Sequence, residues 1–336
     1  MTLHYPQPAT VLLNAERYNS EQDRIYNARL AIKQGLPGLL GPSTGFPALD
    51  SYIGGFLRPG IFTILAPPGS GKTSFALMAA GRCKVPAMFV TAEMAATQIQ
   101  SRMMAQANNS DIFNDPDCYT LDELEFGWLS PSSRQKALDK TLAAYPQLHI
   151  YDAHTVYGGP STEEDELDRI ARAATHLKAG NGSGPPFEHL VIVVDSLTAL
   201  VAKVKKAGED DRTATESVLM RLDSITSTLN ACIVLIVHQH RISADERKKA
   251  TNEDRMAKGK HSAMIEHISH IVADLLNDND EEKTQEVKGT RTKQLTLLKN
   301  RFGPPQMLRY DFKGRNQIFK EWPDQENRAV SRLRIR

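Results

Sequence analysis

The chain has 336 residues, of which 40% are hydrophobic and 24% are charged, and its formal net charge is +1. This length and apolar content are sufficient for one large globular domain or two smaller ones. A net charge so close to zero excludes a general basic field that would attract nucleic acid, so any nucleic-acid site has to be a local patch. The three cysteines are odd in number and lack a C-x-x-C spacing, which argues against a disulfide framework and a zinc site.

The apolar segments of the sequence are too short to cross a membrane. The two most apolar runs, residues 190–194 and 231–237, have the length of strands, and residues 1–23 are too polar for a signal peptide. We therefore expect a soluble protein that works in the cytoplasm, with its cysteines reduced and with no membrane partner.

Residues 1–40 are expected to form an N-terminal arm that contains one helix. Ser20 is a suitable N-cap for a helix over residues 20–33, and the apolar residues of this segment share one narrow face. The helix could pack on the rest of the chain or dock on another subunit, and the sequence favours neither use.

Residues 41–60 are rich in turns and lead into the stretch on which the functional interpretation depends. An apolar, β-prone run over residues 61–66 is followed by a tight Gly/Pro/Ser loop and then by an Ala/Leu/Met-rich segment. This order of strand, loop and helix is the one that a phosphate-binding loop requires. The residues expected to bind nucleotide are Pro68, Gly69, Ser70, Gly71, Lys72, Thr73 and Ser74.

Each part of this loop has a chemical task in the hypothesis. The backbone N–H groups and the following helix N-terminus would cradle an anion, Lys72 would reach the β- and γ-phosphates, and the Thr73 hydroxyl would ligate Mg²⁺. The full pattern begins with glycine where this chain has Ala66, but the close approach to phosphate is made by Gly69 and Gly71. The alternative is a glycine-rich turn with an accidental lysine, and the flanking strand and helix argue against it.

Beyond the loop, strands alternate with helices. The expected strands cover residues 87–91, 149–151, 189–195, 232–237 and 271–276, the expected helices cover 95–107, 131–144, 163–177, 215–230 and 262–265, and a hairpin joins 294–299 to 307–312. This alternation predicts an α/β fold with a mostly parallel twisted sheet, helices on both faces and the ligand at the carboxyl ends of the strands.

Three polar residues at strand ends are candidates for the chemistry of a nucleoside triphosphate. Asp195 would supply a carboxylate for Mg²⁺, Glu93 would orient and deprotonate the attacking water, and Gln239 would hydrogen-bond the γ-phosphate or the water. Each residue also has a purely structural interpretation: Asp195 could form a turn, Glu93 could cap a helix, and Gln239 could be a polar residue that ends a strand. His238 and His240 flank Gln239, but no third ligand follows at a spacing suited to a metal.

The densest basic stretch is the segment of residues 247–261, just beyond Gln239. A loop at that position can move when ATP is hydrolysed, so it could bind a nucleic-acid backbone with little sequence preference. A solvated charged face is the alternative, because Glu253 and Asp254 interrupt the run. The basic residues named in this hypothesis are Arg247, Lys248, Lys249, Lys258, Lys260 and His261.

Lys299 and Arg301 place two cations at the tip of the expected hairpin. They could make salt bridges at a strand end. Alternatively, they could insert into the ATP site of a neighbouring subunit, where an arginine finger neutralises the charge of the transition state.

With these residues in view, residues 44–322 resemble the ATPase domain of replicative hexameric helicases of the bacterial DnaB type, which has a RecA-like core. Residues 44–50 and the Gly54-Gly55 pair are similar to the family's entry motif, and Ala66 matches a phosphate loop that often begins with alanine. The resemblance implies the following roles: Glu93 as catalytic base, Asp195 in the Walker B strand, Gln239 in the sensor motif, and Lys299 and Arg301 as fingers acting in trans.

The resemblance also extends to nucleic acid and to the family's domain order. Residues 262–266 resemble the segment beside the central DNA-binding loop, which implies DNA contacts for Lys260, His261 and Ala263. His261 stands where the family commonly has an acid. The family's helical N-terminal domain, which binds primase, is replaced by residues 1–40, in which only a linker-type helix is similar.

The sequence thus predicts an N-terminal arm (1–40), a RecA-like ATPase domain (41–322) and a basic C-terminal tail (323–336). The leading hypothesis is an ATP- and Mg²⁺-dependent helicase or translocase, and its expected partners are single-stranded DNA, other copies of the chain in a hexamer, and a primase or loader. Two alternatives stay open: an ATP-gated strand-binding filament of recombinase type, and a RecA-like regulatory ATPase that binds protein partners.

Overall fold

The computed structural model of the protein describes residues 22–23, 26–27, 41–56, 60–108, 119–153, 165–180, 187–239, 262–277 and 290–323. Residues 22–23 and 26–27 are helical, while the rest of the helix expected over residues 20–33 lies outside the described residues. In the part of the chain that the structure describes, every helix is too short or too polar to traverse a lipid bilayer.

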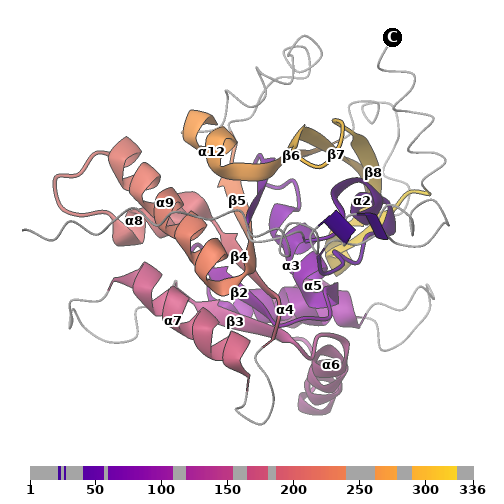
Figure 1. The fold of residues 1–336 in the computed structure, drawn as a ribbon. Helices are drawn as coiled ribbons and strands as arrows, with labels where there is room; N and C mark the ends of the chain where they lie inside the picture. The colour runs from indigo at the N-terminus through magenta and orange to yellow at the C-terminus, as the bar shows by residue number, and fades with distance from the viewer. Residues whose placement is uncertain are drawn as a thin grey trace, which may run out of the picture.

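Nine strands of the described chain form one sheet, in the order β3-β2-β4-β5-β1-β6-β7-β8-β9 (Figure 1). The strands from β3 to β6 in this order are parallel, and β7, β8 and β9 continue the sheet as antiparallel strands. The strands are β1 (Gly60–Ala66), β2 (Ala87–Thr91), β3 (Leu148–Asp152), β4 (Leu190–Asp195), β5 (Ala231–His238), β6 (Ser269–Asn277), β7 (Thr290–Asn300), β8 (Met307–Lys313) and β9 (Ile318–Glu321).

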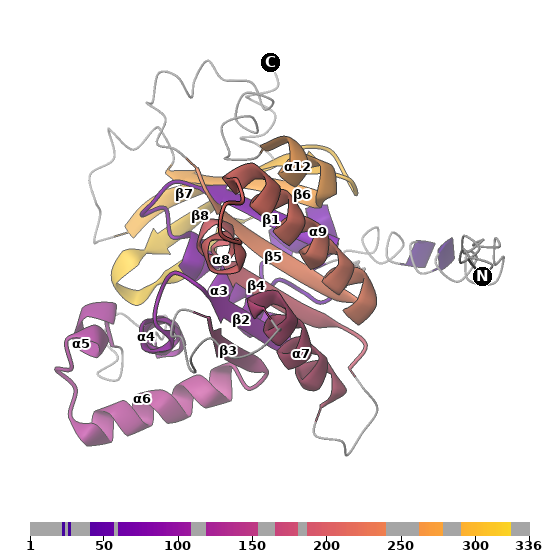
Figure 2. The same ribbon diagram turned by 90° about the vertical axis from the view of Figure 1, so that its left-hand side faces the viewer.

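Helices cover both faces of the parallel part of the sheet (Figures 1 and 2). The helices α3 and α4 pack on one face, and α7, α8 and α9 pack on the other. The helices are α2 (Pro47–Ile53), α3 (Lys72–Arg82), α4 (Ala96–Ala107), α5 (Leu121–Glu125), α6 (Pro131–Ala144), α7 (Glu166–Ala179), α8 (Leu197–Val204), α9 (Asp211–Leu229) and α12 (Ser262–Ile268), with a 3₁₀ turn η2 (Gly314–Asn316).

The strand β1 shows why this sequence builds a sheet that is covered on both sides. All its residues are buried; Phe62 and Ile64 belong to the apolar cluster beneath α3, and Ile61 and Leu65 belong to the cluster beneath α9. Side chains of a strand alternate between its faces, so a strand that is apolar at every position needs helices on both sides. The predicted α/β fold with a mostly parallel sheet is confirmed.

Four elements, α2, α5, α8 and β9, differ from the sequence-based expectation, and α5 is a helix of five residues where none is expected. The helix α2 begins at Pro47, a favourable first position, but the glycines and prolines around it indicate turns. The helix α8 and the strand β9 are too short to show a period of their own. The helix α9 begins at Asp211, earlier than predicted, because Asp210 caps it by accepting hydrogen bonds from the N–H groups of Arg212 and Thr213.

Phe75 on α3 tests this account of the core. Its side chain is 1% exposed, and its ring centroid lies 4.8 Å from that of Phe46 and 5.3 Å from that of Phe319. We expect Phe75→Ala to lower the free energy of unfolding, measured in urea, by about 3–5 kcal/mol, because it leaves a cavity. Phe126→Ala is the matched control, since Phe126 is 68% exposed. Similar losses for the two variants would contradict the assignment of the core.

Candidate nucleotide site

The loop of residues 67–71 leaves β1 at the carboxyl edge of the parallel strands and enters α3. Gly69 and Gly71 have φ angles of +78° and +91°, a region that residues with a side chain rarely adopt. A Cβ atom on Gly71 would lie 2.9 Å from the ring of Phe319, whereas one on Gly69 would meet nothing within 4 Å. Packing therefore restricts Gly71 to glycine, and the backbone at Gly69 borders open space.

The amino end of α3 has the properties of an anion site. Gly71 precedes the helix without a side-chain cap, so the first N–H groups of α3 keep their capacity to donate hydrogen bonds. The Ser70 hydroxyl is buried and has no hydrogen-bond partner among the described residues. A phosphate placed here would satisfy these donors and would be favoured by the helix dipole.

Lys72, Thr73 and Asp195 form a compact charged group beside this loop. Thr73 Oγ1 donates a hydrogen bond of 2.6 Å to Asp195 Oδ2, while the buried Asp195 Oδ1 has no partner in the described part of the chain. Burial raises the pKa of Asp195, and the hydrogen bond from Thr73 and the charge of Lys72 oppose this only in part. A hydroxyl beside an unsatisfied carboxylate oxygen fits Mg²⁺, which prefers oxygen ligands.

Lys72 is buried as well as charged. Burial lowers the pKa of its ammonium group, and the carboxylates of Asp195 and Glu93 act in the opposite direction. A cation that has lost part of its hydration binds an incoming anion more strongly than an exposed one does. This environment suits the role predicted for Lys72 at the phosphates.

Glu93 lies just beyond the end of β2 and contacts a residue that the sequence does not pair with it. His238 Nε2 lies 2.8 Å from Glu93 Oε2. Partial burial acts to raise the pKa of Glu93. The hydrogen bond from His238, the charges of His238 and Lys72 and, last, a weaker interaction with Ser196 outweigh it and leave that pKa below its ordinary value. Glu93 is therefore an ionised carboxylate at neutral pH.

Gln239 is buried next to the start of the loop, and its backbone N–H donates a hydrogen bond of 3.0 Å to the carbonyl of Ala66. The strands β2, β4, β5 and β1 are consecutive in the sheet and parallel. Their carboxyl ends therefore bring Glu93, Asp195 and Gln239 to the edge that holds the loop.

Lys299 and Arg301 lie at the other end of the sheet, beside the carboxyl end of α12. Lys299 Nζ donates to the carbonyl of Glu266, and Arg301 Nη2 donates to the carbonyl of His267 at 3.0 Å. Cations are favoured at this end of a helix. Burial and the neighbouring charge of Arg301 lower the pKa of Lys299, and the carboxylate of Glu266 opposes them in part.

The structure does not bring these two cations to the loop of the same chain. Asn300, which lies between them, pairs with Ile271, and Ile271 pairs with Phe62 near the start of β1. The loop begins only after Ala66, so the two places differ by about 13 Å along the strands, at about 3.3 Å per residue, and they are two strands apart across the sheet. The cation pair and the loop thus occupy opposite edges of one sheet.

Most residues named for nucleic-acid binding lie outside the described residues. These are Arg247, Lys248, Lys249, Lys258, Lys260 and His261. Ala263 is described, and it is exposed in the first turn of α12.

Two sets of polar contacts around the site are not predicted from the sequence. Gln106 Nε2 donates hydrogen bonds to the carbonyls of Ser74 and Gln317, at 2.8 and 2.9 Å. The Ser74 hydroxyl donates to Gln317 Oε1. These bonds connect α3 to α4 and to the turn after η2. The pairing of His238 with Glu93 is the other. Only the second had a signal, because His238 ends β5 and Glu93 follows β2, and the carboxyl ends of these two parallel strands lie at one edge of the sheet with β4 between them.

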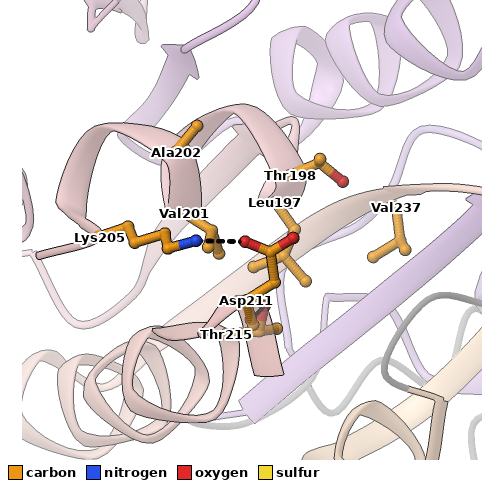
Figure 3. Close-up of a pocket in the computed structure, with 8 residues that line it drawn as sticks. All are labelled: Leu197, Thr198, Val201, Ala202, Lys205, Asp211, Thr215 and Val237. Carbon is orange, nitrogen blue, oxygen red and sulfur yellow. Dashed lines mark hydrogen bonds and ion pairs between the residues drawn. The ribbon is translucent and has the colours of Figure 1, made fainter. Parts of the chain in front are cut away.

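A cavity of about 300 Å³ lies between α8 and α9 (Figure 3). Apolar side chains that include Leu197, Val201 and Val237 line it, and Lys205 Nζ lies 2.6 Å from Asp211 Oδ1 beside them. None of its lining residues belongs to the loop of residues 67–71, so the cavity is separate from the candidate nucleotide site.

A strand, a glycine-rich loop and a helix, with a carboxylate at the end of a parallel strand that one further strand separates from the first, define a RecA-like P-loop fold. The sequence of residues 41–321 matches the family described as DnaB-like helicase C terminal domain, and the chain belongs to that family.

Two relatives are named replicative DNA helicase DnaB. The protein of Pasteurella multocida (strain Pm70) is 24% identical over 304 residues, and that of Haemophilus influenzae (strain ATCC 51907 / DSM 11121 / KW20 / Rd) is 25% identical over 296 residues. The matches cover 89% and 86% of this chain but 59% and 57% of the relatives. The chain therefore spans less than two thirds of the length of these relatives.

Solved structures share the fold. A separately solved ATPase domain has a TM-score of 0.67 at 16% identity, with 90% of this chain and 98% of that chain covered. A DnaB-like replicative helicase, studied with its interactions with primase, has a TM-score of 0.65 at 17% identity, covering 89% and 66%. A KaiC-like protein from Pyrococcus horikoshii OT3 has a TM-score of 0.50 at 18% identity, covering 84% and 98%. The predicted RecA-like fold and the resemblance to the DnaB type are confirmed.

The burial of Asp195 predicts how the nucleotide-free protein responds to pH. Because burial raises its folded-state pKa, the ionised carboxylate costs stability above that pKa, and the cost disappears as the pH falls through it. Asp195→Asn keeps an acceptor for Thr73, and we expect it to raise the free energy of unfolding at neutral pH by on the order of 1 kcal/mol. The difference should vanish in acid, and the exposed Asp122→Asn should show none. A destabilised Asp195→Asn variant at neutral pH would contradict this effect of burial.

Proposed function

We propose that the chain is the ATPase motor of a DnaB-type DNA helicase, which hydrolyses ATP at sites shared between subunits of a homo-hexamer and moves on single-stranded DNA. Residues 41–322 form the ATPase domain in this proposal, residues 1–40 an arm with a linker-type helix, and residues 323–336 a basic tail. Family membership supports the proposal, and the place of Arg301 at the edge opposite the phosphate loop is the observation that carries it.

The triphosphate of ATP would lie in the loop, with its charge met by the N–H groups of α3 and by Lys72. Thr73 and Asp195 would hold Mg²⁺, which neutralises charge on the β- and γ-phosphates. The open space beside Gly69, the unpartnered Ser70 hydroxyl and the unpartnered Asp195 oxygen support this placement.

Glu93 is the proposed base for the attacking water, because its carboxylate is ionised at the edge that holds the loop. Gln239 is the proposed sensor of the γ-phosphate. Its backbone is bonded to Ala66, so a contact between its side chain and the phosphate would act directly on the end of β5. Residues 241–261, which the sequence predicts to be a loop, begin two residues later and would carry that change to DNA.

The position of Arg301 and Lys299 in the sheet supports a role for them in a neighbouring subunit. Neither cation can reach the phosphate loop of its own chain, whereas a head-to-tail contact between copies sets the amino edge of one sheet near the carboxyl edge of the next. Repetition of such a contact closes a ring. An arginine finger supplied in this way is worth about 10³–10⁵ in rate, so hydrolysis would depend on assembly.

The partners of this motor are inferred from its family. Single-stranded DNA would contact Ala263 and the basic residues of the loop that precedes it. A primase or a helicase loader is a further proposed partner, since a DnaB-like helicase of the same fold interacts with primase. Work on DNA in this setting would take place in the cytoplasm, where the buried thiols of Cys83 and Cys232 stay reduced.

Mixed assemblies test whether two chains share one site. Arg301→Ala lacks the finger but keeps its own base, and Glu93→Gln lacks the base but keeps its finger. We expect each variant alone to bind a fluorescent ATP analogue and to hydrolyse ATP at least about 100-fold more slowly than the wild type.

Mixing the two variants should restore hydrolysis, because some sites then pair an intact base with an intact finger. Arg134→Ala, a change at an exposed arginine on α6, is the control and should keep full activity. Absence of recovery at every mixing ratio would refute the shared site.

Binding to single-stranded DNA is measured by fluorescence anisotropy over a range of salt concentrations, with an ATP analogue present. We expect the affinity to fall steeply with salt, and the combined Lys248→Ala and Lys249→Ala changes to reduce the slope of log affinity against log salt by about 1 to 2. The same two changes at Lys136 and Lys140, both exposed on α6, should leave it unaltered. Undetectable binding would favour the regulatory ATPase that acts on protein partners.

A further inference from the structure

The hydrogen bond between His238 and Glu93 connects two elements of the site that are otherwise separate. His238 is the last residue of β5, where it pairs in register with Ala66 of β1, and Gln239 follows it. Glu93 lies beyond β2, on the far side of β4 from β5. The bond of 2.8 Å between His238 Nε2 and Glu93 Oε2 therefore joins the proposed sensor strand to the proposed base across one intervening strand.

The direction of this hydrogen bond is fixed by chemistry. An ionised carboxylate has no proton to donate, so His238 Nε2 carries the proton and donates it to Glu93. The side chain of Glu93 is 46% exposed and that of His238 is 27% exposed, so this contact adds little to the apolar core. A flexible, half-exposed glutamate without such a bond would distribute among several rotamers.

We propose that His238 is a positioning residue for hydrolysis: by donating its Nε2–H to Oε2 of Glu93, it holds the carboxylate so that the other oxygen, Oε1, receives the proton of the attacking water. The proposal rests on the proposed function of Glu93 as base. The neighbouring cation fits it, because the charge of Lys72 adds to the hydrogen bond from His238 in keeping the carboxylate ionised.

The reaction balances without a new reagent. The water oxygen forms a bond to the γ-phosphorus while the bond from that phosphorus to the bridging oxygen breaks, and ADP leaves with the electron pair. Glu93 takes the water proton at Oε1 and later releases it to solvent. His238 keeps its own proton throughout, so its part is geometric.

The link also gives the sensor a short route to the base. A displacement of Gln239 on contact with the γ-phosphate would move His238, its neighbour in the chain, and with it the oxygen of Glu93.

Steady-state ATP hydrolysis by the assembled full chain tests the proposal with three substitutions at His238. His238→Leu removes the donor, and His238→Asn keeps an amide that is too short to reach Glu93. We expect both to lower kcat by about tenfold with KM changed by less than about twofold. His238→Gln can place an amide N–H near the position of Nε2 and should recover most of the loss. His176→Leu, a change at an exposed histidine on α7, is the control.

A second comparison separates positioning from a structural role. If His238 acts through Glu93, His238→Leu should cause no further loss of the residual rate in a Glu93→Gln chain, whereas a structural role would lower the rate by the same factor in both backgrounds. Equal activity of His238→Leu and the wild type, or a His238→Gln variant as slow as His238→Leu, would overturn the proposal. Normal turnover by Glu93→Gln would instead refute the proposed function itself.

Discussion

The common direction of the parallel strands is the constraint on which the rest of this structure depends. Parallel strands place all their carboxyl ends at one edge. The loop after β1 therefore meets the polar residues at the ends of β2, β4 and β5, although these segments are far apart in the sequence. The antiparallel strand β7 runs back, and its last residues Lys299 and Asn300 return to the amino edge. One sheet thereby separates the groups proposed to bind a triphosphate from the cations that would complete its reaction.

Local electrostatics at the carboxyl edge favour ligand binding over the stability of the free protein. Lys72 and Asp195 are buried. Burial lowers the pKa of Lys72 and raises the pKa of Asp195, so it favours the neutral form of each. The hydroxyl of Thr73 satisfies only one oxygen of Asp195. Groups left in this state destabilise the free protein, and a bound metal and phosphate would compensate for that cost. This is the arrangement expected of a site that is preorganised for its ligand.

Much of this site could be predicted from the sequence because its parts follow strands with strong apolar patterns. The run before Ala66 and the run before Asp195 mark strand ends without ambiguity, so their convergence follows from the rules of parallel sheets. The helix α8 and the strand β9 could not be predicted, since they are too short for a period to appear. Likewise, no local pattern could reveal that Gln106 bonds to Gln317, because their contact is set by packing.

The measurement that tests the shared site most directly is the rate of ATP hydrolysis per subunit across a dilution series, with the distribution of oligomers determined in the same samples by mass photometry. If the cation of one copy completes the site of the next, the rate per subunit should rise in proportion to the fraction of chains in rings and approach zero for the monomer. A monomer that hydrolyses ATP as fast as the ring would contradict the account.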